Sequence, residues 1–407
     1  MKRRDFLRNS ALFIGFAPLL TGCNQEEENI RQVVRRQYKD FSLPLLALGE
    51  TFTYSPDDKT SNPREFQKRI DFAMSHGMNY FDVAYMYESE TVENLLAKAL
   101  KKYPRKDYIL GEKMSVYSVK SKEDVRKIFE KQLKIYNVEY FDNYSIFNIV
   151  KKNINNFYKF EIYDELLKLK KEGKIKNLGF SGPTNPTVFD EVAKKYKWDF
   201  CQLKINYLDW EDRYIDKLFE IVKNLSIPTI ALESLKGGTL ASFPQEITDK
   251  IKKEFPSETQ GSLAQKWVAS KSNIVSVLLD TNDFDLLRES AMSFSKEVKF
   301  GMVEEKTVQK IKQFIASTNP VNCNSCGHCR AECPQEIDIP AIILLYNNYK
   351  IDNNKNKFIA EYKKINENKR ADACIHCNRC MPCHRKLNIP EILGEIDSKV
   401  KELGFRA

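Results

Sequence analysis

Short apolar segments alternate with longer amphipathic segments through the middle of the chain, and this alternation limits the fold more than any other feature. Helical patterns such as 65–76, 90–103 and 123–136 carry apolar residues every three or four positions, and Asn62-Pro63 predicts the start of the first helix. Eight such repeats over residues 41–305 predict a (β/α)8 TIM barrel. The competing doubly wound open sheet is disfavoured because no glycine-rich dinucleotide fingerprint follows the first strand. The predicted strands are 43–49, 79–84, 108–113, 140–147, 176–182, 200–207, 228–234 and 274–280.

The first 22 residues have the pattern of an export signal. Paired arginines at positions 3 and 4 precede an apolar run over residues 11–20, and Leu20-Thr21-Gly22-Cys23 resembles a bacterial lipobox. We expect a twin-arginine signal over residues 1–22, lipidation of Cys23 and a location in the bacterial cell envelope, bound to a membrane through acyl chains. The alternative is a transmembrane helix, but a run of about ten apolar residues is shorter than the roughly 20 that a bilayer requires. Residues 23–40 are polar, lack a clear core face and are predicted to be a tether.

The charge distribution argues against a nucleic-acid partner. The formal net charge is +9, but basic and acidic residues are interleaved along the predicted helices and form no basic stripe. We therefore interpret the charge as solvated helix faces.

Two closely spaced cysteine runs lie in the last 90 residues, and they predict a second domain over residues 306–407. The first run, with Pro334 after its last cysteine, fits the bacterial ferredoxin pattern, whereas the second has His384 in place of proline. We expect a small α-rich, ferredoxin-like domain with two [4Fe-4S] clusters; zinc binding and disulfides are the alternatives. Cys201 stands alone on a predicted strand and is expected to be a core residue. In the crossed ferredoxin arrangement, one cluster binds Cys323, Cys326, Cys329 and Cys383, and the other binds Cys374, Cys377, Cys380 and Cys333.

Reactive side chains of a (β/α)8 barrel lie at the carboxyl ends of its strands. The second predicted strand ends at Asp82, Tyr87 follows five positions later, and the third strand ends at Lys113. This pattern resembles the aldo/keto reductase superfamily, in which the tyrosine donates a proton and the aspartate and lysine assist it. The chemistry suits these residue types because an ammonium group beside a phenol eases release of its proton. The alternative is a structural ion pair beneath a core tyrosine.

The same resemblance implies positions for a nicotinamide cofactor, NADP(H) or NAD(H). Ser181 and Gln202 match residues that hold the nicotinamide carboxamide in relatives, and Leu235 and Gly237 match the loop whose backbone amides approach the pyrophosphate. The implied substrate is a small-molecule carbonyl or alcohol. A redox partner protein is expected to exchange electrons with the clusters.

Three positions depart from the family pattern. Phe147 stands where a substrate-orienting histidine is usual, Asp280 stands where the phosphate loop has glycine, and Ser290 replaces an asparagine. Phenylalanine cannot donate a hydrogen bond to a carbonyl, and a carboxylate repels a phosphate. The sequence therefore leaves two functions open: an exported reductase, or an iron–sulfur electron-transfer or binding protein on a barrel that no longer uses NAD(P)H.

Overall fold

The structure, a computed structural model, describes residues 32–38, 41–49, 62–84, 91–147, 149–181, 186–211, 214–323, 328–383 and 385–405. The chain divides into two compact units, residues 1–30 and residues 31–407, and only the second contains described residues. The predicted export signal and the lipidation site at Cys23 therefore lie outside the described residues. Within the described ranges, no helix has the length and apolarity needed to cross a membrane.

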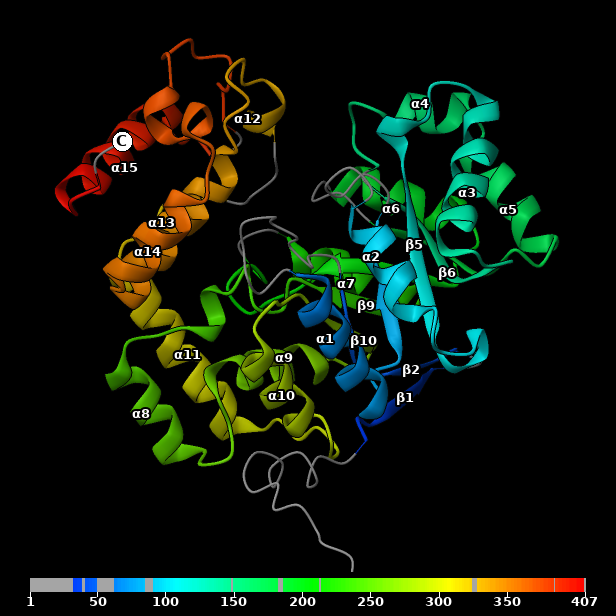
Figure 1. The fold of residues 1–407 in the computed structure, drawn as a ribbon, viewed down its shortest axis with the longest axis horizontal. Helices are drawn as coiled ribbons and strands as arrows, with labels where there is room; N and C mark the ends of the chain where they lie inside the picture. Colours follow the sequence, from blue (N-terminus) through cyan, green and yellow to red (C-terminus); the bar gives the residue numbers. More distant parts are fainter. Residues whose placement is uncertain are drawn as a thin grey trace, which may run out of the picture. The chain divides into compact units, whose positions relative to one another are not determined.

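Eight parallel strands close into a barrel in the order β10-β3-β4-β5-β6-β7-β8-β9 (Figure 1). Each strand falls within or beside a segment predicted from the sequence, so the barrel is confirmed and the open doubly wound sheet is excluded. The strands are β3 Leu46–Leu48, β4 Tyr80–Asp82, β5 Ile109–Ser115, β6 Phe141–Phe147, β7 Ile175–Ser181, β8 Phe200–Lys204, β9 Thr229–Leu232 and β10 Ile274–Leu279.

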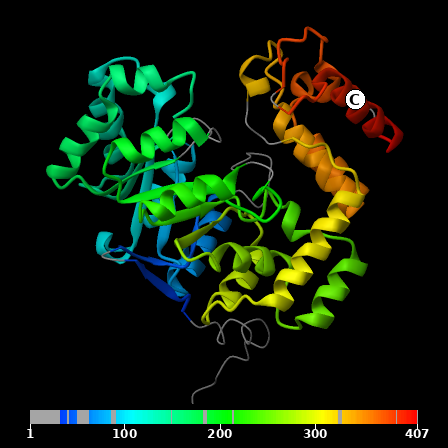
Figure 2. The ribbon, with the colours of Figure 1, turned by 180° about the vertical axis from the view of Figure 1, so that it is seen from behind.

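Ten described helices accompany the barrel strands, and Figure 2 shows those on the side hidden in Figure 1. Helix α1 begins as predicted, because the side chain of Asn62 accepts hydrogen bonds from the backbone N–H groups of Arg64 and Glu65, and Pro63 occupies the first turn. The helices are α1 Pro63–Ser75, α2 Thr91–Leu100, α3 Lys122–Tyr136, α4 Ile154–Lys159, α5 Ile162–Lys171, α6 Pro186–Lys195, α7 Ile215–Asn224, α8 Gln245–Glu254, α9 Gln260–Ala269 and α10 Phe284–Ser293.

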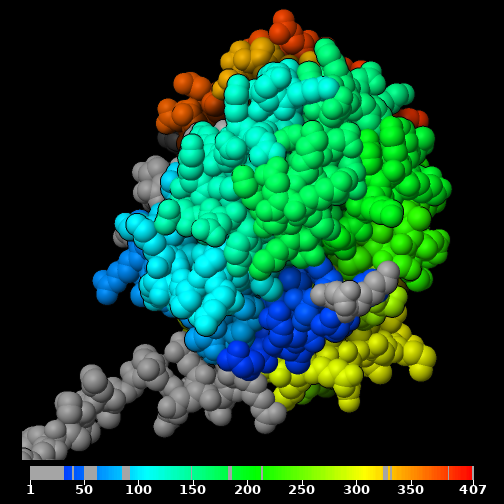
Figure 3. Space-filling view, turned by 90° about the vertical axis from the view of Figure 1, so that its right-hand side faces the viewer, coloured from blue at the N-terminus to red at the C-terminus, as the bar shows by residue number. Residues whose placement is uncertain are grey.

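A hairpin covers the amino-terminal end of the barrel, where we had predicted the last part of a tether. Strand β1, Arg35–Tyr38, pairs antiparallel with β2, Phe41–Pro44, and Figure 3 shows residues of this hairpin in dark blue on the surface. The guanidinium of Arg36 donates to the backbone oxygens of Ala269 and Ile274 at 2.7 and 2.8 Å. The tether prediction was wrong for residues 33–38, since Val33 is buried. Long polar side chains can cover apolar surface with their stems, so a polar sequence can still pack against the barrel.

Helices make up most of the carboxyl-terminal region. Helix α11 begins before residue 305 and ends after it, so the chain has no break at the predicted domain boundary. The division into two domains stays a prediction. An apolar core that includes Ile343, Phe358 and Leu393 holds α13, α14 and α15 together. The helices are α11 Met302–Ser317, α12 His328–Ala331, α13 Ile339–Asp352, α14 Lys355–Lys363 and α15 Ile389–Glu402.

Candidate functional site

The predicted partners Asp82 and Lys113 meet inside the barrel. Asp82 ends β4 and lies opposite Gly111 of β5, so Lys113, two residues further along β5, points to the same interior face. The Lys113 ammonium forms an ion pair with Asp82 Oδ1 and donates to the backbone oxygen of Val83 at 2.8 Å. Both side chains are buried, with exposed fractions of 0% and 1%. Tyr87, the predicted proton donor, lies outside the described residues.

The second carboxylate oxygen of Asp82 is held by two neutral donors. Tyr80 Oη donates to Asp82 Oδ2 at 2.6 Å, and Gln202 Nε2 donates to the same oxygen at 2.8 Å. Ser145 Oγ in turn donates to Gln202 Oε1 at 3.3 Å. This network fixes the orientation of Asp82, and through it the position of the Lys113 ammonium.

Sequence reasoning missed Tyr80 and Ser145 as members of the site. The available signal was their strand periodicity, because Tyr80 precedes Asp82 by two residues on a strand and therefore shares its face. Burial and the Asp82 carboxylate raise the pKa of Tyr80 well above its usual value, so its hydroxyl remains a donor. The contact between Gln202 and Asp82 was also missed, since it joins strands on different sides of β5, β6 and β7.

Gly111 provides the space for this network. A Cβ atom at position 111 would lie 2.5 Å from Asp82 Oδ2, which is closer than nonbonded atoms approach, and 3.0 Å from Tyr80 Cε2, which is a tight contact. Glycine at this strand position therefore allows the tyrosine and the aspartate to occupy the same interior layer.

The predicted carboxamide-binding residues lie on adjacent strands. Ser181 pairs with Gln202 between β7 and β8, and Phe147 pairs with Ser181 between β6 and β7. Phe147 thus stands at the carboxyl end of its strand, as the alignment with the family pattern predicted. The Gln202 side chain is already engaged with Asp82 and Ser145, so its first role in this structure is to position Asp82.

In the loop after β9, where the family resemblance implied a dinucleotide phosphate, one backbone amide is bonded within the chain itself. Leu235 is buried, and the backbone N–H of Gly237 donates to Glu233 Oε2 at 3.0 Å. A Cβ atom at Gly237 would lie 2.5 Å from Leu344 Cδ2 of α13, so the carboxyl-terminal region approaches this glycine closely on one side while the residue itself stays exposed. The amide predicted to approach a pyrophosphate is bound to a carboxylate of the chain itself, and we assign no chemical step to a nicotinamide.

Four cysteines line one small cavity in the carboxyl-terminal region, together with apolar residues that include Ile337 and Leu393. These four are the set that the crossed ferredoxin arrangement assigns to one cluster: Cys333, Cys374, Cys377 and Cys380. Each described cysteine is a free thiol. No three ligand-type side chains among the described residues are grouped so as to hold a metal ion.

The other predicted set includes Cys323, Cys329 and Cys383, whereas Cys326 lies outside the described residues.

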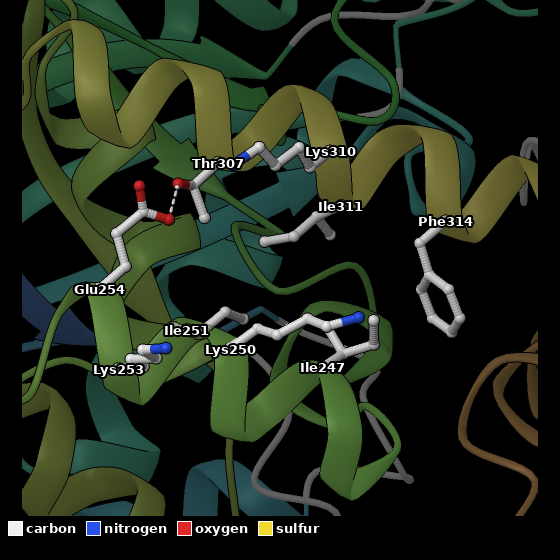
Figure 4. Close-up of a pocket in the computed structure, with 9 residues that line it drawn as sticks. All are labelled: Ile247, Lys250, Ile251, Lys253, Glu254, Thr307, Lys310, Ile311 and Phe314. Carbon is white, nitrogen blue, oxygen red and sulfur yellow. Dashed lines mark hydrogen bonds between the residues drawn. The ribbon is translucent and has the colours of Figure 1, made fainter.

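A separate cavity of about 470 Å³ lies between α8 and α11 (Figure 4). Glu254 accepts a hydrogen bond from Thr307 Oγ1 at 2.8 Å on one side of it. None of the predicted site residues lines this cavity. Its lining consists of Ile247, Lys250, Ile251, Lys253, Glu254, Thr307, Lys310, Ile311 and Phe314.

Comparison with known proteins identifies the barrel. The profile of the aldo/keto reductase family matches residues 46–311. An uncharacterized oxidoreductase of Schizosaccharomyces pombe is 25% identical over 256 residues, which are 58% of this chain and 77% of the relative. A probable aldo-keto reductase of Glycine max is 33% identical over 128 residues. That match covers 29% of this chain and 36% of the relative.

Solved structures agree in fold. An aldo-keto reductase from Bacillus halodurans in its holo form superposes with a TM-score of 0.55 at 19% identity, over 69% of this chain and 96% of the other. An aldo-keto reductase from Klebsiella pneumoniae, solved in complex with NADPH, superposes with a TM-score of 0.56 at 17% identity, over 69% and 95%. At these identities the likeness establishes the barrel fold.

Proposed function

The chain belongs to the aldo/keto reductase family, and from this premise we propose that it interconverts a small-molecule carbonyl and the corresponding alcohol, with Tyr87 as the proton donor. Its relatives include a protein named as an oxidoreductase and one named as an aldo-keto reductase. The observation that carries the proposal is the buried Lys113–Asp82 ion pair, held by Tyr80 and Gln202 at the carboxyl ends of the strands.

The geometry supports a specific division of labour. Reduction of a carbonyl takes up two electrons and two protons, and the developing alkoxide requires one proton at its oxygen. A phenol with a pKa of about 10 gives up its proton more easily beside a fixed ammonium, because the positive charge stabilises the phenolate. In this proposal Lys113 supplies that charge to Tyr87, and Asp82 orients the lysine through the buried ion pair.

For the carboxyl-terminal region we propose a ferredoxin-like domain with two [4Fe-4S] clusters that exchange single electrons with a redox partner protein. The cysteine spacing and the cavity lined by Cys333, Cys374, Cys377 and Cys380 support this proposal. We further propose export by the twin-arginine route and attachment to a membrane in the bacterial cell envelope through Cys23, on the basis of the amino-terminal sequence.

A second candidate function is an iron–sulfur electron-transfer or binding protein on a barrel without reductase activity. Phe147 at the end of β6 favours it, because the ring offers no hydrogen bond to a carbonyl oxygen. The retained Lys113–Asp82 pair opposes it, because desolvation of two charges is costly and a barrel without proton chemistry could fill the same space with apolar residues.

The test compares Tyr87→Phe with wild-type protein, both purified without oxygen and matched for iron content. Reduction of a panel of aldehydes and ketones is measured with NADPH and, separately, with a reduced viologen as the electron donor. Loss of the proton donor should lower kcat/KM by roughly 100-fold or more. Tyr103→Phe is the matched control, because it removes a tyrosine hydroxyl that donates to Asp71, and neither residue belongs to the proposed site.

Two outcomes would contradict this assignment. Equal activity in Tyr87→Phe and wild-type protein would remove Tyr87 as the donor. Absence of carbonyl reduction by wild-type protein with either electron donor, while the clusters accept and return electrons, would favour the second candidate function.

A further inference from the structure

The loop after β9 carries an anionic group of its own at the position expected for a cofactor phosphate. Glu233, Lys236, Gly237 and Gly238 all have positive φ, between 48° and 86°, so the loop is tightly curled. The Glu233 carboxylate accepts the backbone N–H of Gly237 at 3.0 Å, and its other oxygen lies 3.6 Å from the Lys204 ammonium. A carboxylate inside this curl uses an amide that a phosphate would otherwise need.

One stripe of helix α13 lies on the same loop. Leu344 contacts Gly237, Asn348 Oδ1 accepts a hydrogen bond from Thr239 Oγ1 at 2.5 Å, and Asp352 Oδ2 accepts one from Ser242 Oγ at 3.4 Å. The three α13 residues are four positions apart, so they form a single helix face. The contact with the loop is therefore one continuous docking face that combines an apolar contact at one end with two hydrogen bonds.

The second position implied for a cofactor phosphate is also acidic. Asp283 caps the start of α10 and accepts hydrogen bonds from the backbone N–H groups of Asp285 and Leu286 at 2.9 and 3.2 Å. Asp280 Oδ1 lies 2.7 Å from where a Cβ atom of Gly49 would stand, at the carboxyl end of the neighbouring strand. Carboxylates thus use the amides of the helix terminus and repel an incoming phosphate.

From these contacts we propose that the loop at residues 233–242 is the docking site of helix α13, and that docking and dinucleotide binding exclude each other. The cysteine-rich region is the partner that this loop receives in place of a pyrophosphate. The proposal rests on the family membership of the barrel and is independent of the role given to Tyr87.

The experiment uses the full chain with its clusters, handled without oxygen, and combines NADPH titration with hydrogen exchange of the loop and of α13. The titration follows nicotinamide fluorescence up to millimolar NADPH. In wild-type protein without NADPH we expect slow amide exchange in both segments. NADPH should either show no saturable binding or bind with faster amide exchange in α13. The double variant Leu344→Ala/Asn348→Ala should raise amide exchange in residues 233–242 by about tenfold or more. Lys350→Ala is the matched control, because its ammonium bonds the backbone oxygen of Asn319 and not the loop.

Two results would overturn the proposal. The first is saturable NADPH binding by wild-type protein in which the loop becomes more protected while α13 keeps its protection, since both occupants would then share the site. The second is unchanged loop exchange in the double variant, which would show that α13 does not cover the loop. Neither result depends on carbonyl reduction, so failure here is distinguishable from failure of the proposed activity.

Discussion

Replacing Lys113 with methionine should strongly destabilise the barrel, because it leaves Asp82 as a buried carboxylate without its cation. The lysine ammonium now bonds Asp82 Oδ1 and the backbone oxygen of Val83, and both charged side chains are shielded from water. Removal of one partner of a buried pair costs about 3–5 kcal/mol. Tyr80 and Gln202 still donate to the other carboxylate oxygen, which places the expected cost near the lower end of that range.

The assay is thermal unfolding followed by circular dichroism, with Lys113→Met, Asp82→Asn and the double variant compared at equal iron content. For a domain of this size, about 3–5 kcal/mol corresponds to a fall in Tm of roughly 6–20 °C. The two substitutions should be non-additive by roughly 0.5–3 kcal/mol, because each removes the same ion pair. Lys250→Met is the control, because it breaks a solvent-exposed pair with Glu246 that should contribute little to stability.

The reasoning would be refuted by simple additivity. If Lys113→Met lowers Tm equally in the wild-type and Asp82→Asn backgrounds, the two groups are not coupled. A fall no larger than that of Lys250→Met would show that the charges are not buried together.

Three further predictions follow from single positions. Burial, followed by the neighbouring Glu93, raises the pKa of Glu112 well above its usual value. The stability contributed by its protonated form is therefore fully present below about pH 4.3, the unfolded pKa, and is lost as pH rises through the folded pKa. Glu112→Gln should raise Tm at pH 8 by more than at pH 5, and an equal gain at both pH values would contradict this. Gly111→Ala should cost about 1–3 kcal/mol in unfolding free energy, because the new methyl group overlaps the carboxylate of Asp82; unchanged denaturant midpoints would argue against the close approach. Cys201→Ala should leave the iron and sulfide content unchanged, whereas Cys374→Ala should lower both; iron loss in the first variant would make the buried thiol a ligand.

The strands and the meeting of Asp82 with Lys113 could be predicted from the sequence for a shared reason. Strand periodicity is local, and neighbouring strands of a parallel barrel bring their carboxyl ends to one edge. A residue at the end of one strand and a residue near the end of the next must then lie close together. Nothing beyond adjacent segments is needed for that inference, and the structure places the pair accordingly.

Contacts that depend on barrel closure or on side-chain choice could not be predicted in this way. The bond from Gln202 to Asp82 crosses 120 residues of sequence and requires the curvature of the closed sheet. Strand β1 was missed because its four residues, RRQY, carry no apolar alternation. Arg36 instead fixes the strand with its guanidinium hydrogen bonds, and its aliphatic stem can cover apolar surface. The Leu344 contact with Gly237 depends on how α13 lies on the loop, which no local pattern reports.

Under our proposals, proton transfer and dinucleotide binding require different groups of the barrel. Proton transfer requires a few fixed groups in the interior, and Asp82, Lys113 and Gln202 form one connected network there. A dinucleotide instead requires open backbone amides at two loops, and in this chain Glu233 and Asp283 bond amides at both places. Helix α13 lies on the first of these loops through Leu344 and Asn348. The contact between loop and helix is therefore the feature whose disruption tests whether a dinucleotide can reach the loop after β9.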